Sequence, residues 1–157
     1  MRAWKCRAPA LEVLVLALHY PFRAARYTCF GATVQAFGGR NRGGLYRWRR
    51  ASSVQSVLTE AQQAQGIAGI ISCWYSEAAA IGSTFARKHG IPHYCWLLGQ
   101  DARAGNPWPR RLKLPAGELV ALSGFLQETF SGNHSVRPTR VIEPGVEQLG
   151  DTPQHAR

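Results

Sequence analysis

Polar residues and glycines stand where the apolar segments of this sequence end, and their positions predict a ligand-binding edge. Ligands of open parallel α/β sheets bind outside the carboxyl ends of the strands. The residues at these predicted ends are Tyr20, Pro21, Gly38, Gly39, Trp74, Glu77, Gly99, Gln100, Asp101, Ser123 and Gly145. Each residue alone is typical of an ordinary turn. Together they predict the rim of a cleft.

A glycine-rich, basic loop with the sequence GGRNRGG spans residues 38–44. Glycines allow backbone N–H groups to approach an anion, and arginines add positive charge. We therefore expect phosphate contacts from Gly38, Gly39, Arg40 and Arg42. The loop lacks both the GxGxxG and the GxxxxGK[ST] pattern, so the alternative is a flexible surface loop.

The basic run RWRR follows this loop at residues 47–50, with Tyr46 directly before it. Arginines interleaved with aromatic residues can stack on bases or bind phosphates. The alternative is that these arginines are the exposed face of an amphipathic helix.

No metal site or catalytic nucleophile is predicted by the histidines, cysteines and serines. The histidines show no HExxH or His/carboxylate spacing, and no GxSxG segment is present. The four cysteines form no CxxC pair, which favours a reducing cytoplasm. We expect this chain to hold neither a metal nor a cofactor of its own.

The elements that must position the predicted edge are organised around residues 66–101. A short β-branched apolar run at 67–71 is typical of a buried strand. A helix then begins after Ser76, ends near Gly90, and is followed by a second apolar strand at 93–98. Two buried strands joined by a helical crossover form a βαβ unit.

Strands and helices alternate through most of the remaining chain. We expect strands at 13–18, 30–37, 118–122 and 140–142, helices at 45–65 and 124–130, and loops at 20–29 and 102–115. This alternation predicts a Rossmann-like, doubly wound, open parallel sheet in a single three-layer α/β/α domain.

The charge balance restricts the partners of the protein. The 157 residues include 19 Lys and Arg against nine Asp and Glu, a formal net charge of +10. Such an excess favours phosphorylated ligands, nucleic acid or an anionic membrane surface, and the alternative is a basic surface that serves solubility. The apolar run at 8–18 is interrupted by Glu12 and predicts a strand rather than a secretory signal. No segment is long enough to span a membrane.

The order of three motifs resembles the N-terminal domain of a bacterial GT-B glycosyltransferase of family four. The segments are SCWYSEAAAIGSTFARKHGIPHYCWLLGQD, ELVALSGFLQETF and RVIEPGVE. Their matching positions are Gly99 and Asp101 in a turn after a strand, Ser123 at the end of a strand, and Gly145-Val146. The resemblance implies an acceptor-binding domain at 11–146, an N-terminal extension at 1–10, and a polar tail at 147–157 that is a stub of the interdomain linker.

The resemblance implies transfer of a sugar from a nucleotide-sugar donor to a glycan or a lipid-linked acceptor, with retention at the anomeric carbon. The nucleotide sugar would be a co-substrate, bound by a second, C-terminal domain that this sequence lacks. We therefore expect this chain alone to be inactive. The cleft residues would contact the acceptor, and no catalytic residue is expected in this chain.

Two positions depart from the family pattern. Leu98 stands where many relatives have a histidine that faces the donor sugar. The Gly-Gly pair follows the second predicted strand, at Gly38-Gly39, rather than the first.

Other readings of the sequence remain open. One alternative is a basic polyanion-binding module, although the resemblance makes nucleic acid the less favoured partner. Another is a truncated gene product without function. For the transferase we expect a cytoplasmic protein with peripheral contact to an anionic membrane.

Overall fold

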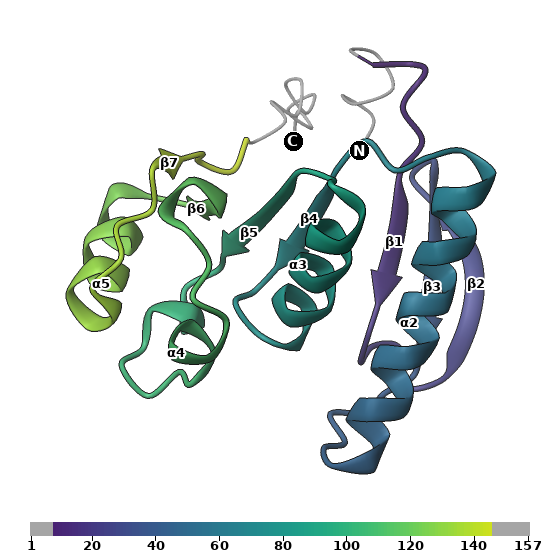
Figure 1. Cartoon of the computed structure of the whole chain (residues 1–157), viewed down its shortest axis with the longest axis horizontal. Coiled ribbons are helices and arrows are strands. Elements are labelled where there is room, and N and C mark those ends of the chain that lie inside the picture. The colour runs from purple at the N-terminus through teal and green to yellow at the C-terminus, as the bar shows by residue number, and fades with distance from the viewer. Residues whose placement is uncertain (1–7, 146–157) are drawn as a thin grey trace, which may run out of the picture. The chain divides into compact units, whose positions relative to one another are not determined.

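The computed structural model describes residues 8–145 of the 157-residue chain. These residues form a mixed α/β structure with two hydrogen-bonded sheets (Figure 1). The chain divides into two compact units, whose described parts are residues 8–69 with 84–91, and residues 70–83 with 92–145. The expected tail at 147–157, Val146 and most of the expected N-terminal extension lie outside the described residues.

The first unit contains a three-stranded mixed sheet and one long helix. The strands are β1 (Leu14–Ala17), β2 (Ala24–Cys29) and β3 (Ala32–Phe37), in the order β1-β3-β2. β1 and β3 are parallel, whereas β2 and β3 form an antiparallel hairpin. Phe30 and Gly31 make its turn, both at positive φ, which matches the twist of the flanking strands. The helix α2 (Leu45–Ala64) follows β3.

The second unit contains a four-stranded sheet, and every strand in it is parallel. The strands are β4 (Ile70–Cys73), β5 (His93–Leu97), β6 (Leu119–Ala121) and β7 (Arg140–Val141), paired in sequence order. The helix α3 (Glu77–His89) connects β4 to β5, which confirms the predicted βαβ unit. α3 ends at His89 because Gly90 takes a left-handed conformation, with φ of 66°.

Short helices fill the connections on either side of β6. The 3₁₀ turn η1 (Gln100–Ala102) and the helix α4 (Trp108–Leu112) follow β5, and the 3₁₀ turn η2 (Ala116–Glu118) precedes β6. The helix α5 (Gly124–His134) follows β6, and the Oγ atom of Ser123 caps it by accepting a hydrogen bond from the backbone N–H of Leu126.

One apolar core lies inside the second unit. Its side chains come from β5, β6, α3, α5 and the connections between them, and they include the stacked rings of Tyr75 and Phe130. The alternate strand residues Cys95 and Leu97 are fully buried, as are Leu119 and Ala121. This sheet is therefore held by a core of its own.

Several predictions about the elements were wrong. The predicted single parallel sheet is replaced, among the described residues, by two sheets in two compact units. The sheet of the first unit is not entirely parallel, because residues 24–29, expected in a loop, form the antiparallel strand β2. That strand is an outer strand with mostly exposed side chains, so it lacks the apolar alternation of a half-buried strand. Residues 102–115 are not all loop either, since prolines favour the first turn of the helix α4. Among the described residues, no helix is long and apolar enough to cross a membrane.

Candidate functional site

The Asp101 carboxylate joins the two turns that follow β4 and β5. Its Oδ1 atom accepts a hydrogen bond of 2.8 Å from the backbone N–H of Tyr75, and Oδ2 accepts one of 2.7 Å from that of Leu98. Asp101 is only 3% exposed. Burial raises the pKa of this carboxyl above its ordinary value, although the backbone hydrogen bonds act in the opposite direction. Asp101 therefore fixes the relative positions of two strand ends.

Asn106 strengthens the same junction. Its Nδ2 atom donates to the backbone oxygens of Tyr75 and Asp101, at 3.2 and 3.1 Å. The hydroxyl of Tyr75 accepts a hydrogen bond from the backbone N–H of Leu114. The turn after β4 is thus attached to the chain on both sides of α4.

Beside this junction, Trp74, Gly99 and Gln100 remain exposed, and we refer to these three residues as the carboxyl rim. Trp74 directly follows β4, is 50% exposed, and has a φ of 70°, a conformation that costs energy for a bulky residue. Gly99 has a φ of 98°, which favours glycine. Because β4 and β5 are adjacent and parallel, both turns lie at the same edge of the sheet. This is the edge where ligands of parallel sheets bind.

The other predicted rim residues of this unit have different surroundings. Ser123 caps α5 at the end of β6, so its hydroxyl already serves the helix. Glu77 is buried in the first turn of α3. Gly145 is exposed and lies four residues beyond β7. Whether any of them touches a ligand stays a prediction.

In the first unit, hydrogen bonds join the turn after β1 to the glycine-rich loop after β3. The backbone N–H of Asn41 donates to Nδ1 of His19, and its Nδ2 atom donates to the hydroxyl of Tyr20, at 3.1 and 2.9 Å. The Nε atom of Arg40 donates to the backbone oxygen of Phe22. The Tyr20-Pro21 peptide bond between these contacts is cis.

Several backbone amides of the loop already have protein acceptors. The N–H groups of Gly39, Arg40 and Arg42 donate to the backbone oxygens of Leu18, His19 and Gly39, respectively. A phosphate at this loop would therefore compete with protein acceptors for these three amides. The contacts expected from Gly38, Gly39, Arg40 and Arg42 stay predictions.

Close packing explains the Gly38-Gly39 pair. A Cβ atom at Gly38 would overlap the backbone of Arg23 and Ala24, and one at Gly39 would overlap the guanidinium of Arg50. The buried Arg50 reaches from α2 to this loop, where Nη1 lies 3.5 Å from the backbone oxygen of Gly39, and Nη2 lies 3.3 Å from that of Arg42.

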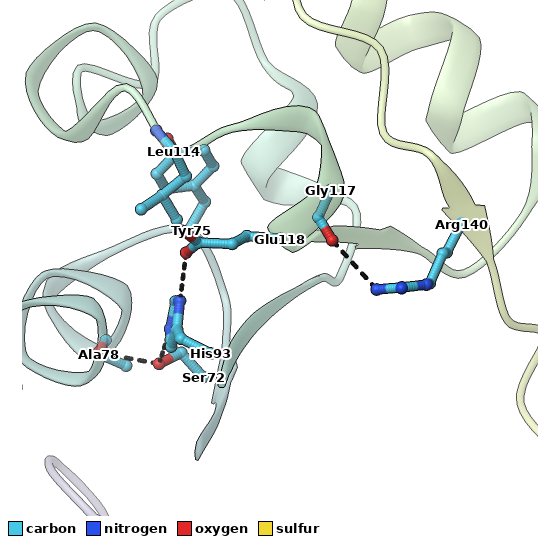
Figure 2. A network of polar contacts seen from close by, with 8 residues as sticks. All are labelled: Ser72, Tyr75, Ala78, His93, Leu114, Gly117, Glu118 and Arg140. Carbon is cyan, nitrogen blue, oxygen red and sulfur yellow. Dashed lines mark hydrogen bonds and ion pairs between the residues drawn. The ribbon is translucent and has the colours of Figure 1, made fainter. Parts of the chain in front are cut away.

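Ser72, His93 and Glu118 form a second polar network in the second unit (Figure 2). Nε2 of His93 lies 3.0 Å from Oγ of Ser72, and its Nδ1 lies 2.7 Å from Oε2 of Glu118. A serine, a histidine and a carboxylate in this order are also the parts of a hydrolytic triad. Here, however, Ser72 is 5% exposed and its hydroxyl donates to the backbone oxygen of Ala78.

The surroundings of this network identify it as structural. Gly82 packs against the Ser72 hydroxyl so closely that a Cβ atom would overlap it, which leaves no space for a substrate. His93 begins β5 and Glu118 directly precedes β6, so these two residues lie at the amino ends of their strands, whereas the carboxyl rim follows the other ends.

The described part of the chain has no metal-ligand cluster, and two of its thiols have a shifted pKa. Between residues 8 and 145, no cluster of three or more His, Cys, Asp and Glu side chains could hold a metal ion. Burial raises the pKa of the Cys95 thiol far above its ordinary range, and it also raises that of Cys73, with Asp101 contributing a smaller effect to both.

Sequence reasoning missed the residues that support these sites. Asn106 was not singled out, and Asn41 was counted only as part of the glycine-rich loop. Arg50 was expected on an exposed basic face and Asp101 at a cleft surface, but both are buried. Asn41, an amide residue following a Gly-Gly pair, is typical of a turn with positive φ, which was the available signal. The partners of Arg50 and Asn106 depend on tertiary contacts.

Comparisons of the chain with protein-family models, curated proteins and solved structures gave no match.

Proposed function

We propose that this chain is the acceptor-binding domain of a retaining GT-B glycosyltransferase with a Rossmann-like, doubly wound fold. In each half of a doubly wound sheet, parallel strands follow one another outward in sequence order, with a helix in each crossover. In support, the parallel sheet of the second unit has the order β4-β5-β6-β7 and a helix in each crossover, as one such half does. The motif order of the sequence supplies the choice of family.

The observation that carries the proposal is the exposed, strained Trp74 of the carboxyl rim, at the same edge of the sheet as Gln100. A flat indole ring can pack on the C–H face of a sugar, while a side-chain amide hydrogen-bonds its hydroxyls. Binding sites combine an apolar surface with a few such polar groups. Asp101 and Asn106 hold the turn in place, which lowers the entropic cost of binding.

In the proposed reaction, an acceptor hydroxyl held at this domain replaces the nucleoside diphosphate on the anomeric carbon of the donor sugar. The donor would be bound by a second domain. The contribution of this chain is to orient the acceptor, which lowers the barrier by converting an encounter in solution into a reaction between held groups.

The test is sugar transfer from radiolabelled nucleotide sugars to a membrane extract. The full chain would be assayed alone and fused to the donor-binding domain of a GT-B glycosyltransferase. We expect transfer by the fusion only, with a loss of at least tenfold in Trp74→Ala and Gln100→Ala. The matched control is Phe30→Ala, which removes an exposed aromatic ring at the β2–β3 turn. Transfer that is absent from the fusion, or unaffected by Trp74→Ala, would contradict the proposal.

A further inference from the structure

The first turns of α2 carry apolar side chains on the face that points away from the core. Leu45 is 83% exposed and Trp48 is 80% exposed. They lie three residues apart, so they are neighbours on one face of the helix. The apolar residues of α2 that are buried, Val54 and Leu58, lie four residues apart on the inner face of the helix.

Positive charge surrounds these apolar side chains. Arg42, Arg47 and Arg49 are exposed, and the guanidinium of Arg42 lies 5.0 Å from the centre of the Tyr46 ring. The sequence from Leu18 to Thr59 contains no Asp or Glu. It contains seven arginines, Arg23, Arg26, Arg40, Arg42, Arg47, Arg49 and Arg50. No carboxylate of this stretch can therefore neutralise the surface.

The surface is also held in a defined conformation. Arg50 is buried and donates to the backbone oxygens of Gly39 and Arg42, which attaches the loop to the helix that follows it. Exposed arginines alone would be explained by solubility. Large apolar side chains held on the outer face of a helix gain nothing from water.

We propose that this surface, formed by Arg40, Arg42, Leu45, Tyr46, Arg47, Trp48 and Arg49, binds an anionic phospholipid membrane. The arginines pair with lipid phosphates, while Leu45 and Trp48 enter the boundary between headgroups and acyl chains. Trp and Tyr favour this boundary, and a helix there presents apolar residues beside basic ones. The first turns of α2 thus act as a peripheral membrane contact.

The exposed aliphatic side chain of Leu45 favours a membrane over a single-stranded nucleic acid. Both partners attract arginines, and both accept Tyr46 and Trp48. Leu45 distinguishes them, because an aliphatic side chain cannot stack on a nucleic-acid base but can insert among acyl chains. Nucleic-acid binding is therefore the competing outcome of the experiment.

The experiment is flotation of the full chain with vesicles. Vesicles of phosphatidylglycerol and phosphatidylcholine in equal amounts would be compared with vesicles of phosphatidylcholine alone, at low and at high salt. We expect binding to the anionic vesicles only, weakened by salt. Arg47→Gln and Arg49→Gln should each weaken binding about fivefold. Trp48→Ala and Leu45→Ala should each weaken binding about tenfold at high and low salt alike.

Matched controls remove similar side chains elsewhere. Arg87→Gln neutralises an exposed arginine in the last turn of α3, and Phe125→Ala removes an exposed ring in the first turn of α5. Neither should change vesicle binding. Insertion has its own signal, because brominated lipids should quench the fluorescence of Trp48, and Trp48→Phe should remove that quenching.

Three results would overturn the proposed membrane contact. The chain could fail to bind anionic vesicles, or it could bind them equally well after Leu45→Ala and Trp48→Ala. It could also prefer a single-stranded oligonucleotide at physiological salt. Since vesicle binding needs no sugar donor, its outcome is independent of the transferase proposal.

Discussion

Gly82 of α3 packs directly on the hydroxyl of Ser72 in β4, with no room between them for a Cβ atom. That hydroxyl is at the same time hydrogen-bonded to the backbone oxygen of Ala78 and to Nε2 of His93 (Figure 2). Helix α3 and strands β4 and β5 therefore meet at one point, where the Ser72 hydroxyl leaves no space for a side chain at position 82.

Adding a methyl group at this point should destabilise the protein. Gly82→Ala should cost about 1–3 kcal/mol in the free energy of unfolding, because overpacking forces the Ser72 side chain away from its partners. The measurement is urea denaturation. In the Ser72→Ala background, the same Gly82→Ala substitution should cost less, since the overlapping oxygen is gone. Equal costs in both backgrounds would show that Ser72 is not the obstacle.

Removing the Asp101 carboxylate should also destabilise the fold. Asp101→Ala leaves the backbone N–H groups of Tyr75 and Leu98 without acceptors, which should cost about 2–4 kcal/mol. Asp101→Asn should cost less, because its amide oxygen still accepts one of the two hydrogen bonds. Unfolding in urea would give both values. If Asp101→Ala is as stable as the natural protein, the carboxylate does not hold the two turns.

The stability should depend on pH through the same carboxyl group. Burial raises the pKa of Asp101 in the folded protein, so the folded chain holds this proton more tightly than the unfolded chain. Protonated Asp101 therefore contributes to the free energy of unfolding. This contribution is fully present at pH values below the ordinary carboxyl pKa, and it is lost as the pH rises through the higher pKa of the folded protein.

The melting temperature of the natural protein and of Asp101→Asn, measured across the acidic range, isolates this effect. The difference between the natural protein and the variant should fall as the pH rises. Carboxylates such as Glu128, whose pKa is lowered by Arg137, act in the opposite direction but are common to both proteins. If the difference in melting temperature rises with pH, folding lowers the pKa of Asp101 rather than raising it.

The backbone of Trp74 offers a test of strain at the carboxyl rim. At most sites alanine is more stable than glycine, but the positive φ of Trp74 should invert that order. Trp74→Gly should be more stable than Trp74→Ala by about 1 kcal/mol. At Arg87, in a regular turn of α3, the alanine variant should be the more stable of the two. The same order at both positions would exclude strain at Trp74.

The buried Arg50 should not tolerate lysine. An ammonium group cannot replace the planar guanidinium that serves both Gly39 and Arg42, so Arg50→Lys should cost about 1–3 kcal/mol. Arg49→Lys changes the exposed neighbour and should have little effect. Chemical denaturation of both variants checks the comparison, and equal stability of the two would show that charge alone is sufficient at position 50.

Local patterns in the sequence predicted much of the fold. The βαβ unit was predicted because β4 and β5 are apolar runs, and because Gly90 ends α3 where the sequence indicates. The helix α2 and the start of α5 after Ser123 were predicted for similar reasons. β2 and α4 were missed, since an exposed outer strand and a proline-rich helix of five residues carry no apolar period.

The candidate site was less predictable than the fold. The sequence identified the residues that follow the strands, because turn residues mark strand ends. It could not show that Asp101 is buried rather than exposed, because its partner Tyr75 lies 26 positions away in the chain. His93 and Glu118 are separated by 25 positions. Such pairs become visible only when the sheet fixes which residues are adjacent.

The outer position of β2 gives its arginine a further role. β2 is hydrogen-bonded to β3 on one side, and Arg26 projects from this mostly exposed strand. An open strand edge is a template on which another chain can add a strand and begin to aggregate. A charged side chain there repels an identical edge. We therefore expect Arg26 to oppose edge-to-edge pairing of separate molecules.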